Sequence, residues 1–153
     1  MIILGVDPGL SGALAWLNDG ELIEAVDMPV VAGSVNAPAF SEWLDEHSYL
    51  RPDMAVVEKV HSMPGQGVAS TFKFGASYGC VLGILGVSGI RVEHVTPNQW
   101  KKHFNLIGKE KDESRKFALD RWPTQSGLFS RKKDHGRADA ALIGLWGHSV
   151  VGT

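Results

Sequence analysis

Three acidic residues stand where the chain could bring carboxylates to one point. Asp7 follows an apolar run at residues 2–6, and Glu58 follows another at residues 54–57. Asp139 lies near the start of the last apolar segment of the chain. The carboxyl ends of neighbouring parallel strands meet at one edge of a sheet, and a helix can pack across that edge. We therefore expect the three side chains to lie close together.

A cluster of this kind is typical of a metal site. Carboxylates a few ångströms apart raise one another's pKa, so a cluster kept at neutral pH normally holds a cation. Oxygen ligands with at most one imidazole favour Mg²⁺ or Mn²⁺ over zinc. Two such ions could activate water and stabilise the leaving oxygen in phosphodiester hydrolysis. Each acid also has a plainer interpretation, as a turn residue, an exposed strand end or a first-turn helix acid.

Apolar runs and turn residues predict the elements that would position these acids. Asn18-Asp19-Gly20 favours a tight hairpin, because Asp-Gly accepts positive φ angles, and Asn36 is placed to cap a helix. We expect one α/β domain over residues 1–153, with a five-stranded mixed sheet flanked by helices, in which three antiparallel strands precede two parallel ones. The strands are expected at residues 2–6, 12–17, 21–28, 54–57 and 91–96, the helices at 38–47, 69–86, 97–103, 112–121 and 137–150, and a loop at 61–68.

Two of these helices carry informative patterns. Gly75, Gly79 and Gly83 recur every fourth residue, and helical glycines are costly, so we expect a close neighbour on that face. That neighbour is either the chain's own sheet or a second copy across a dimer two-fold. The last helix has a stripe formed by Asp139, Ile143, Trp146 and Val150, and the aromatic residues, Phe72, Phe74 and Tyr78 among them, are interpreted mostly as core residues.

Composition excludes several classes of protein. With 153 residues, 44% hydrophobic and 21% charged, the chain is neither disordered nor a disulfide-built miniprotein. The net charge of −2 hides an asymmetry, because residues 1–58 carry ten acids and one base, whereas residues 59–153 carry seven acids and fourteen bases. The single cysteine, Cys80, and the lack of a leader pattern predict a cytoplasmic protein. The longest weakly polar stretch, residues 75–90, is interrupted by serines and glycines, and no membrane span is expected.

Three motifs, in order and spacing, resemble the RuvC-type Holliday junction resolvases, most closely their short bacteriophage members. They are Ile3-Leu4-Gly5-Val6-Asp7-Pro8-Gly9, Ala55-Val56-Val57-Glu58 and Asp134-His135-Gly136-Arg137-Ala138-Asp139-Ala140. The resemblance spans essentially the whole chain. It implies a ribonuclease-H-like fold, a homodimer, dependence on Mg²⁺ or Mn²⁺, and paired nicks across a four-way DNA junction in the cytoplasm of a bacterium or phage-infected host. By position, Asp7, Glu58 and Asp139 correspond to three of the family's four metal-binding carboxylates.

The fourth ligand departs from the better-known bacterial pattern. That pattern has Asp or His three residues before the last Asp, where this chain has Gly136. His135 lies four residues before Asp139, which is one helical turn, and Asp134 lies five before it. We favour Asp134 as the ligand, because hard cations prefer carboxylate, with His135 as a further ligand or as the base that orients water.

The basic half of the chain predicts a DNA-binding face beside the acids. Phosphate contacts from lysine and arginine supply affinity and offset repulsion between the acids and the DNA backbone. Arg115 and Lys116 more plausibly pair with neighbouring acids. The resemblance also implies catalytic lysines near Lys101 or Lys102 and near Lys109 or Lys111. Candidate DNA-binding residues are Lys101, Lys102, Lys109, Lys111, Arg131, Lys132 and Lys133.

The loop after Glu58 is expected to contact the crossover of a junction. Bacterial relatives have an aromatic residue here, whereas this chain has His61-Ser62-Met63-Pro64, so His61 or Met63 would insert or stack. An inert connector is the alternative. For the whole protein, the alternatives are a nuclease of the same fold acting on other branched DNA or an RNA–DNA hybrid, and a junction-binding module that does not cut.

Overall fold

A mixed sheet of five strands forms the centre of the molecule, in the order β3-β2-β1-β6-β7. The computed structural model describes residues 1–151. The first three strands are antiparallel, and β1, β6 and β7 run parallel to one another. This is the expected arrangement. The strands are β1 (Ile2–Asp7), β2 (Ala13–Asn18), β3 (Glu21–Asp27), β6 (Met54–Glu58) and β7 (Val92–Val95).

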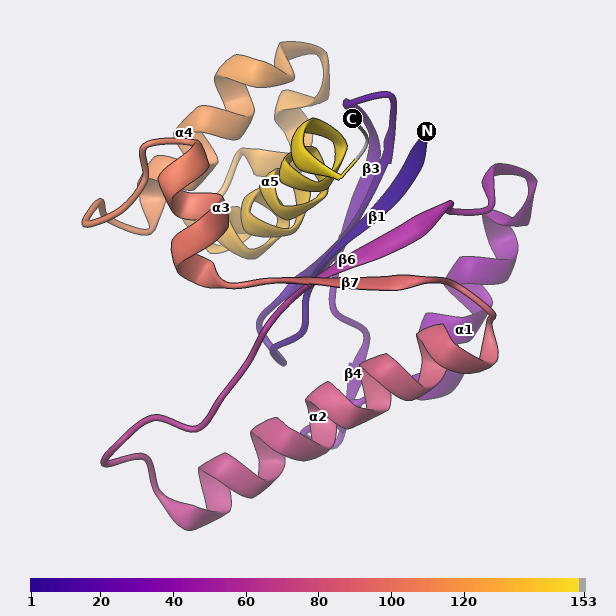
Figure 1. Ribbon diagram of the computed structural model, residues 1–153, viewed down its shortest axis with the longest axis vertical. Coiled ribbons are helices and arrows are strands. Elements are labelled where there is room, and N and C mark those ends of the chain that lie inside the picture. The colour runs from indigo at the N-terminus through magenta and orange to yellow at the C-terminus, as the bar shows by residue number, and fades with distance from the viewer. Residues whose placement is uncertain (152–153) are drawn as a thin grey trace.

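Helices cover both faces of the sheet (Figure 1). Helices α1 and α2 lie on one face and α3, α4 and α5 on the other, and each face has its own hydrophobic core. The cores form because each strand alternates its side chains between the two faces. The helices are α1 (Ala37–Glu46), α2 (Val68–Val87), α3 (Pro97–His103), α4 (Asp112–Arg121) and α5 (His135–Val150).

Helices α1 and α3 begin at the capping residues and the proline that the sequence indicates. The Asn36 side chain accepts a hydrogen bond from the Ala39 N–H at 3.2 Å and caps α1. Thr96 and Gln99 form a capping box that starts α3, with Pro97 in its first turn. Short elements without a helical or strand period were not foreseen. These are the hairpin of β4 (Val30–Val31) and β5 (Ser34–Val35), and 3₁₀ turns at Ser48–Leu50, Pro123–Phe129 and Lys132–Asp134.

Helix α5 is buried on nearly all sides, which corrects the expected single stripe. Its residues from Gly136 to Gly147 are mostly buried, whereas Val150, a member of that stripe, is 47% exposed. The reason is that α5 lies between the sheet and α4, so both of its long faces are covered. A helix that is apolar all round is typical of such a position.

The close approach of α5 to the sheet depends on glycine. A Cβ on Gly5 of β1 would lie 2.0 Å from the Ala140 carbonyl oxygen, and one on Gly144 would lie 2.5 Å from a Leu17 methyl group. A Cβ on Gly136 would lie 2.7 Å from the Ser11 carbonyl oxygen. Backbone therefore packs directly on backbone, and the first turns of α5 are held over the end of β1.

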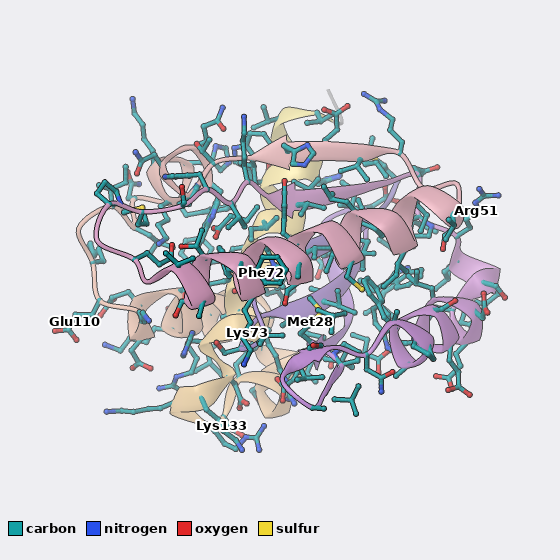
Figure 2. All side chains as sticks on the ribbon, turned by 90° about the horizontal axis from the view of Figure 1, so that it is seen from below. Met28, Arg51, Phe72, Lys73, Glu110 and Lys133 are labelled. Carbon is teal, nitrogen blue, oxygen red and sulfur yellow. The ribbon has the colours of Figure 1, made fainter. Side chains whose placement is uncertain are left out.

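Helix α2 carries an exposed apolar surface. Its glycine face, Gly75, Gly79 and Gly83, has nothing within 4 Å of any added Cβ, so the chain's own sheet is not the close neighbour. Phe72 is 78% exposed, contrary to its interpretation as core, while Phe74 is half-buried. Figure 2 views this side of the molecule, with Phe72 and Lys73 on α2.

The same helix qualifies one expectation about membranes. Among residues 1–151, α2 is long and apolar enough to cross a membrane, judged by length and composition alone. No membrane span was expected here, because serines and glycines interrupt residues 75–90. The absence of a membrane partner stays a prediction.

Replacing Gly5 by Ala tests the contact between α5 and β1. The added methyl group overlaps the Ala140 carbonyl, so we expect the free energy of unfolding to fall by about 3 kcal/mol in urea denaturation. Gly127→Ala is the matched control, because an added Cβ there meets nothing within 4 Å, and we expect a change of less than about 0.5 kcal/mol. Equal stability of the two variants would contradict the contact.

Candidate active site

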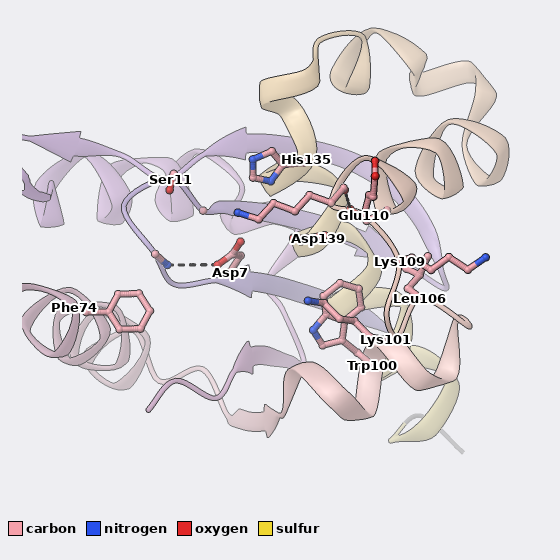
Figure 3. Close-up of a pocket in the computed structure, with 14 residues that line it drawn as sticks. Asp7, Ser11, Phe74, Trp100, Lys101, Leu106, Lys109, Glu110, His135 and Asp139 are labelled. Carbon is pink, nitrogen blue, oxygen red and sulfur yellow. Dashed lines mark hydrogen bonds between the residues drawn. The ribbon is translucent and has the colours of Figure 1, made fainter. Parts of the chain in front are cut away.

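The three acids expected to cluster do share one site. In the parallel register Val6 pairs with Val57, so Asp7 and Glu58 end neighbouring strands at the same edge of the sheet. Asp139, in the second turn of α5, faces the same place. Asp7 and Asp139 line a cavity of about 250 Å³ (Figure 3). Glu58 is outside that lining but within electrostatic range, because its charge raises the pKa of Asp7 and its own pKa is raised by the charge of Asp139.

Burial and mutual repulsion destabilise the charged forms of these acids. Burial, followed by the charges of Glu58 and Asp139, raises the pKa of Asp7 from 3.8 to about 7, against a hydrogen bond from the Gly9 N–H and the charge of Lys101. Burial also raises the pKa of Glu58 and that of Asp139. The site therefore holds more negative charge at neutral pH than its protein surroundings stabilise, which favours binding of a cation.

Two groups that the sequence analysis did not assign to the site touch the acids. The buried Trp100 of α3 donates its indole N–H to Glu58 Oε2 at 2.6 Å. The Ser114 hydroxyl, on α4, opposes the rise in the pKa of Asp139. Both residues line the cavity. The sequence did contain a signal for Trp100. It lies in the first turns of the helix that follows β7, and β7 is the strand next to Glu58, so a position near Glu58 could have been predicted.

The structure places His135, not Asp134, with the acids. Asp134 is 1% exposed and is outside the cavity lining, and both of its oxygens accept hydrogen bonds from the Arg131 side chain, one of them also from the Arg131 N–H. These bonds lower the pKa of Asp134 against its burial. His135 is the first residue of α5, one turn before Asp139, and lines the cavity. The arrangement favours His135 over Asp134, whose carboxylate is paired with arginine, and the identity of the fourth ligand stays a prediction.

The predicted basic residues divide into two groups. Lys101, Lys109 and Lys111 line the cavity. The charge of Lys101 lowers the pKa of all three acids and that of Lys111 lowers the pKa of Asp139, whereas Lys109 extends away from Asp7 (Figure 3). The second group is exposed and outside the cavity, and consists of Lys102, Arg131, Lys132 and Lys133.

Arg115 and Lys116 pair locally as expected. Arg115 binds Asp112 at 2.7 Å and Lys116 binds Glu113 at 2.9 Å, each across three residues of α4.

The loop after Glu58 is exposed and ends in an apolar tip. His61 and Met63 are both exposed, as is Val68 at the start of α2. Met63, Val68 and Phe72 surround a second hollow, separate from the cavity that holds the acids. We call these three residues the apolar tip.

The acids do not form a closed ion cage. Within residues 1–151, no three His, Cys, Asp or Glu side chains are arranged to hold a metal ion as they stand. An open site of this kind suits Mg²⁺, which keeps several waters and is usually bound by one or two carboxylates together with substrate phosphates. The donor set, carboxylates and one imidazole, also suits Mn²⁺.

Comparison with known proteins identifies the fold. No family model matches the chain. Thermus thermophilus RuvC in complex with a Holliday junction substrate superposes with a TM-score of 0.67 at 21% identity, over 100% of this chain and 97% of RuvC. The chain has the RuvC fold. A second T. thermophilus RuvC structure has a TM-score of 0.62 at 22% identity, over 100% of this chain and 98% of that one. The yeast mitochondrial Holliday junction resolvase Ydc2 has a TM-score of 0.58 at 14% identity, over 95% of this chain and 77% of Ydc2.

A sequence relative agrees with the RuvC fold. The Holliday junction resolvase MOC1, chloroplastic, from Chlamydomonas reinhardtii is 37% identical over 91 residues. The match spans 59% of this chain but only 10% of MOC1, so the chain corresponds to a small part of that relative. Together the comparisons confirm the resemblance to RuvC-type resolvases that the three motifs carry, and the ribonuclease-H-like α/β fold.

Asp7→Asn tests the electrostatics of the acid cluster. A carboxyl whose pKa is higher in the folded than in the unfolded protein destabilises the fold as pH rises through the interval between the two values, here about 4 to 7. Asparagine removes that penalty. In metal-free buffer we expect Asp7→Asn to be about 2 kcal/mol more stable than wild type at pH 8, with the difference shrinking toward pH 4.

Urea denaturation in EDTA at several pH values measures this difference. Asp120→Asn, at an exposed position of α4, is the control and should show no such dependence. A difference between Asp7→Asn and wild type that is the same at pH 4 and pH 8 would mean that Asp7 has an ordinary pKa.

Proposed function

We propose that the protein is a metal-dependent DNA endonuclease that resolves four-way junctions by paired nicks, a crossover junction endodeoxyribonuclease. The observation that carries the proposal is the cluster of Asp7, Glu58 and Asp139 at one edge of a sheet with the RuvC fold. Burial raises the pKa of all three acids, and the charges of neighbouring acids raise those of Asp7 and Glu58 further. The names of the similar proteins support the substrate, since MOC1 and Ydc2 are called Holliday junction resolvases and RuvC was solved with a junction.

Asp7, Glu58, Asp139 and His135 would hold the metal, Mg²⁺ or Mn²⁺, in two ions per site. When bound, such ions supply charge neutralisation for the carboxylates and the phosphate and lower the pKa of water. Lys101 lines the cavity and offsets part of the negative charge of Asp7, and it would bind the scissile phosphate. The imidazole of His135 is placed beside Asp139, either as a ligand or as the acceptor of the proton that the attacking water loses.

The reaction is a phosphodiester hydrolysis. The water oxygen forms a bond to phosphorus, the bond from phosphorus to the 3′ oxygen breaks, and that oxygen takes up a proton. The products are a 5′-phosphate and a 3′-hydroxyl end. Asp7 and Asp139 would hold the cation that attracts the phosphate to the cavity, which Trp100 and Leu106 also line.

The exposed basic residues would bind the DNA arms. Lys102, Lys132 and Lys133 are exposed, and Arg131 keeps a half-exposed side chain while it binds Asp134. Lys101, Lys109 and Lys111 lie at the cavity and would contact the phosphates next to the cut. A chain of net charge −2 would bind DNA in this way because three of its 17 acids lie in the site, with lysines at the cavity beside them.

The apolar tip and His61 would contact the crossover. Apolar wedges and flat rings both stack on bases that are unpaired at a junction. Met63 and Phe72 are exposed side by side around the second hollow, so Phe72 supplies the aromatic ring that the loop itself lacks.

We propose further that two copies pair through α2 and that the dimer is a cytoplasmic protein of a bacterium or phage-infected cell. The glycine face of α2 is exposed and free of side chains, which allows two helices to approach closely. The exposed apolar neighbour Val87 would be covered by the same contact. A two-fold pair presents two sites to two strands of a symmetric junction.

Gly79→Arg tests pairing through α2. The monomer has room for the side chain, and arginine is the better helix former, so folding should be unaffected or slightly improved. We expect wild type to sediment as a dimer and Gly79→Arg as a monomer. On a cruciform plasmid, wild type should give linear product directly, whereas the variant should give nicked circles.

Gly127→Arg, on another surface with nothing within 4 Å, is the control and should stay dimeric. If Gly79→Arg sediments as a dimer and still gives linear plasmid directly, α2 is not the interface.

Cleavage of labelled substrates tests the function itself. In Mg²⁺ we expect paired symmetric nicks in a synthetic four-way junction and none in linear duplex. Asp7→Asn should bind the junction normally but cut it about a thousandfold more slowly, a loss of several kcal/mol of transition-state stabilisation. Asp120→Asn should cut like wild type.

Other results would favour the other candidate functions. Cleavage of an RNA–DNA hybrid in preference to the junction would indicate a different nuclease of this fold. Junction binding with no cut in either Mg²⁺ or Mn²⁺ would indicate a binding module.

A further inference from the structure

The hydrogen bond between Trp100 and Glu58 links a core residue to the proposed metal site. Trp100 Nε1 lies 2.6 Å from Glu58 Oε2, a short bond to a carboxylate. Within residues 1–151 it is the one hydrogen bond that the Glu58 side chain makes, and it occupies only one of the two oxygens. Asp7 and Asp139 have no tryptophan partner of this kind.

The position of Trp100 is fixed from several sides. The indole is 1% exposed and packs in the core on the α5 face of the sheet. The capping box of Thr96 and Gln99 fixes the start of its helix, four residues before Trp100. The register pairs Glu58 with Val95, so the helix that begins after β7 turns back over the end of β6. A rigid donor therefore meets a carboxylate on a strand end.

The same ring also holds a cation. Lys101 Nζ lies 5.3 Å from the centre of the Trp100 ring, within the range of a cation–π contact. One indole thus fixes two groups of the site, the Glu58 carboxylate by its N–H and the Lys101 ammonium by its face.

We propose that Trp100 is a positioning residue that orients Glu58 for the metal, leaving one carboxylate oxygen for the ion, and that steadies Lys101. This inference deepens the proposed function and rests on it for the identity of the metal. Groups that hydrogen-bond a metal ligand from behind typically change metal affinity or activity about 10- to 100-fold when removed.

Trp100→Phe removes the N–H and keeps most of the ring. We expect the Mg²⁺ concentration that gives half-maximal junction cleavage to rise about tenfold, with junction binding in EDTA unchanged. Mn²⁺ binding measured by calorimetry should weaken by a similar factor, without any need for cleavage.

The chain contains a matched control in Trp122. Its indole is equally buried, donates to the Gly20 carbonyl at 3.2 Å and has Arg121 5.5 Å from its ring centre, but it lies outside the cavity lining. Trp122→Phe loses the same atoms and should leave both the Mg²⁺ dependence and the Mn²⁺ affinity unchanged.

A double-mutant cycle separates positioning from general packing. In metal-free protein, the change in stability caused by Trp100→Phe should be smaller in a Glu58→Gln background than in wild type, because the charge-assisted bond is already weakened. Equal changes in both backgrounds, together with unchanged Mn²⁺ affinity in Trp100→Phe, would overturn the proposal.

A measurement on the unmutated protein covers the case in which Trp100→Phe does not fold. With ¹⁵N-labelled indole groups, Mg²⁺ should shift the Trp100 resonance and leave that of Trp122 in place. A Trp100 resonance that does not respond to saturating Mg²⁺ would also overturn the proposal. If wild type cuts no junction yet Mn²⁺ binding depends on Trp100, the proposed function fails and the positioning role stands.

Discussion

The backbone of α5 lies directly against β1, and the rest of the site depends on this contact. Gly5 and Gly144 leave no side chain between the two elements, and Gly136 lets the first turn of α5 approach the turn after β1. Asp139 is thereby fixed beside Asp7. Any larger residue at these positions would move α5 outward and separate the carboxylates, so packing in the core sets the geometry of the chemistry.

This packing destabilises the charged forms of the acids at the edge of the sheet. Three acids are withdrawn from water and repel one another, and within the cavity Lys101 and Lys111 offset that charge only in part. A fold normally avoids such an arrangement unless a ligand balances it. This imbalance of charge is the physical basis for the cation that the proposed function requires.

The sequence predicted the five strands of the sheet, their directions and the three acids, because apolar runs that end in a charged residue are a clear signal. It placed Asn36 as a cap and Asp19-Gly20 in a turn for the same reason, since the local chemistry decides these features. Asp134 was named as the fourth ligand, but its pairing with Arg131 was not foreseen, because that pairing could be recognised only once the short 3₁₀ turn between them was known. Phe72 was placed in the core because an aromatic residue in an apolar helix is usually buried, yet α2 extends past the sheet. Trp100 was interpreted only as a core residue. Its indole does pack in the core, but its N–H also donates a hydrogen bond to Glu58.

The most direct measurement is anomalous diffraction from crystals soaked in Mn²⁺. If the stressed carboxylates form the metal site, anomalous density will lie beside Asp7 and the carboxylate of Glu58 or Asp139, and Asp7→Asn crystals soaked in the same way will lack it. Density beside Asp134, or none at the sheet edge in wild-type crystals that bind Mn²⁺ elsewhere, would contradict this explanation.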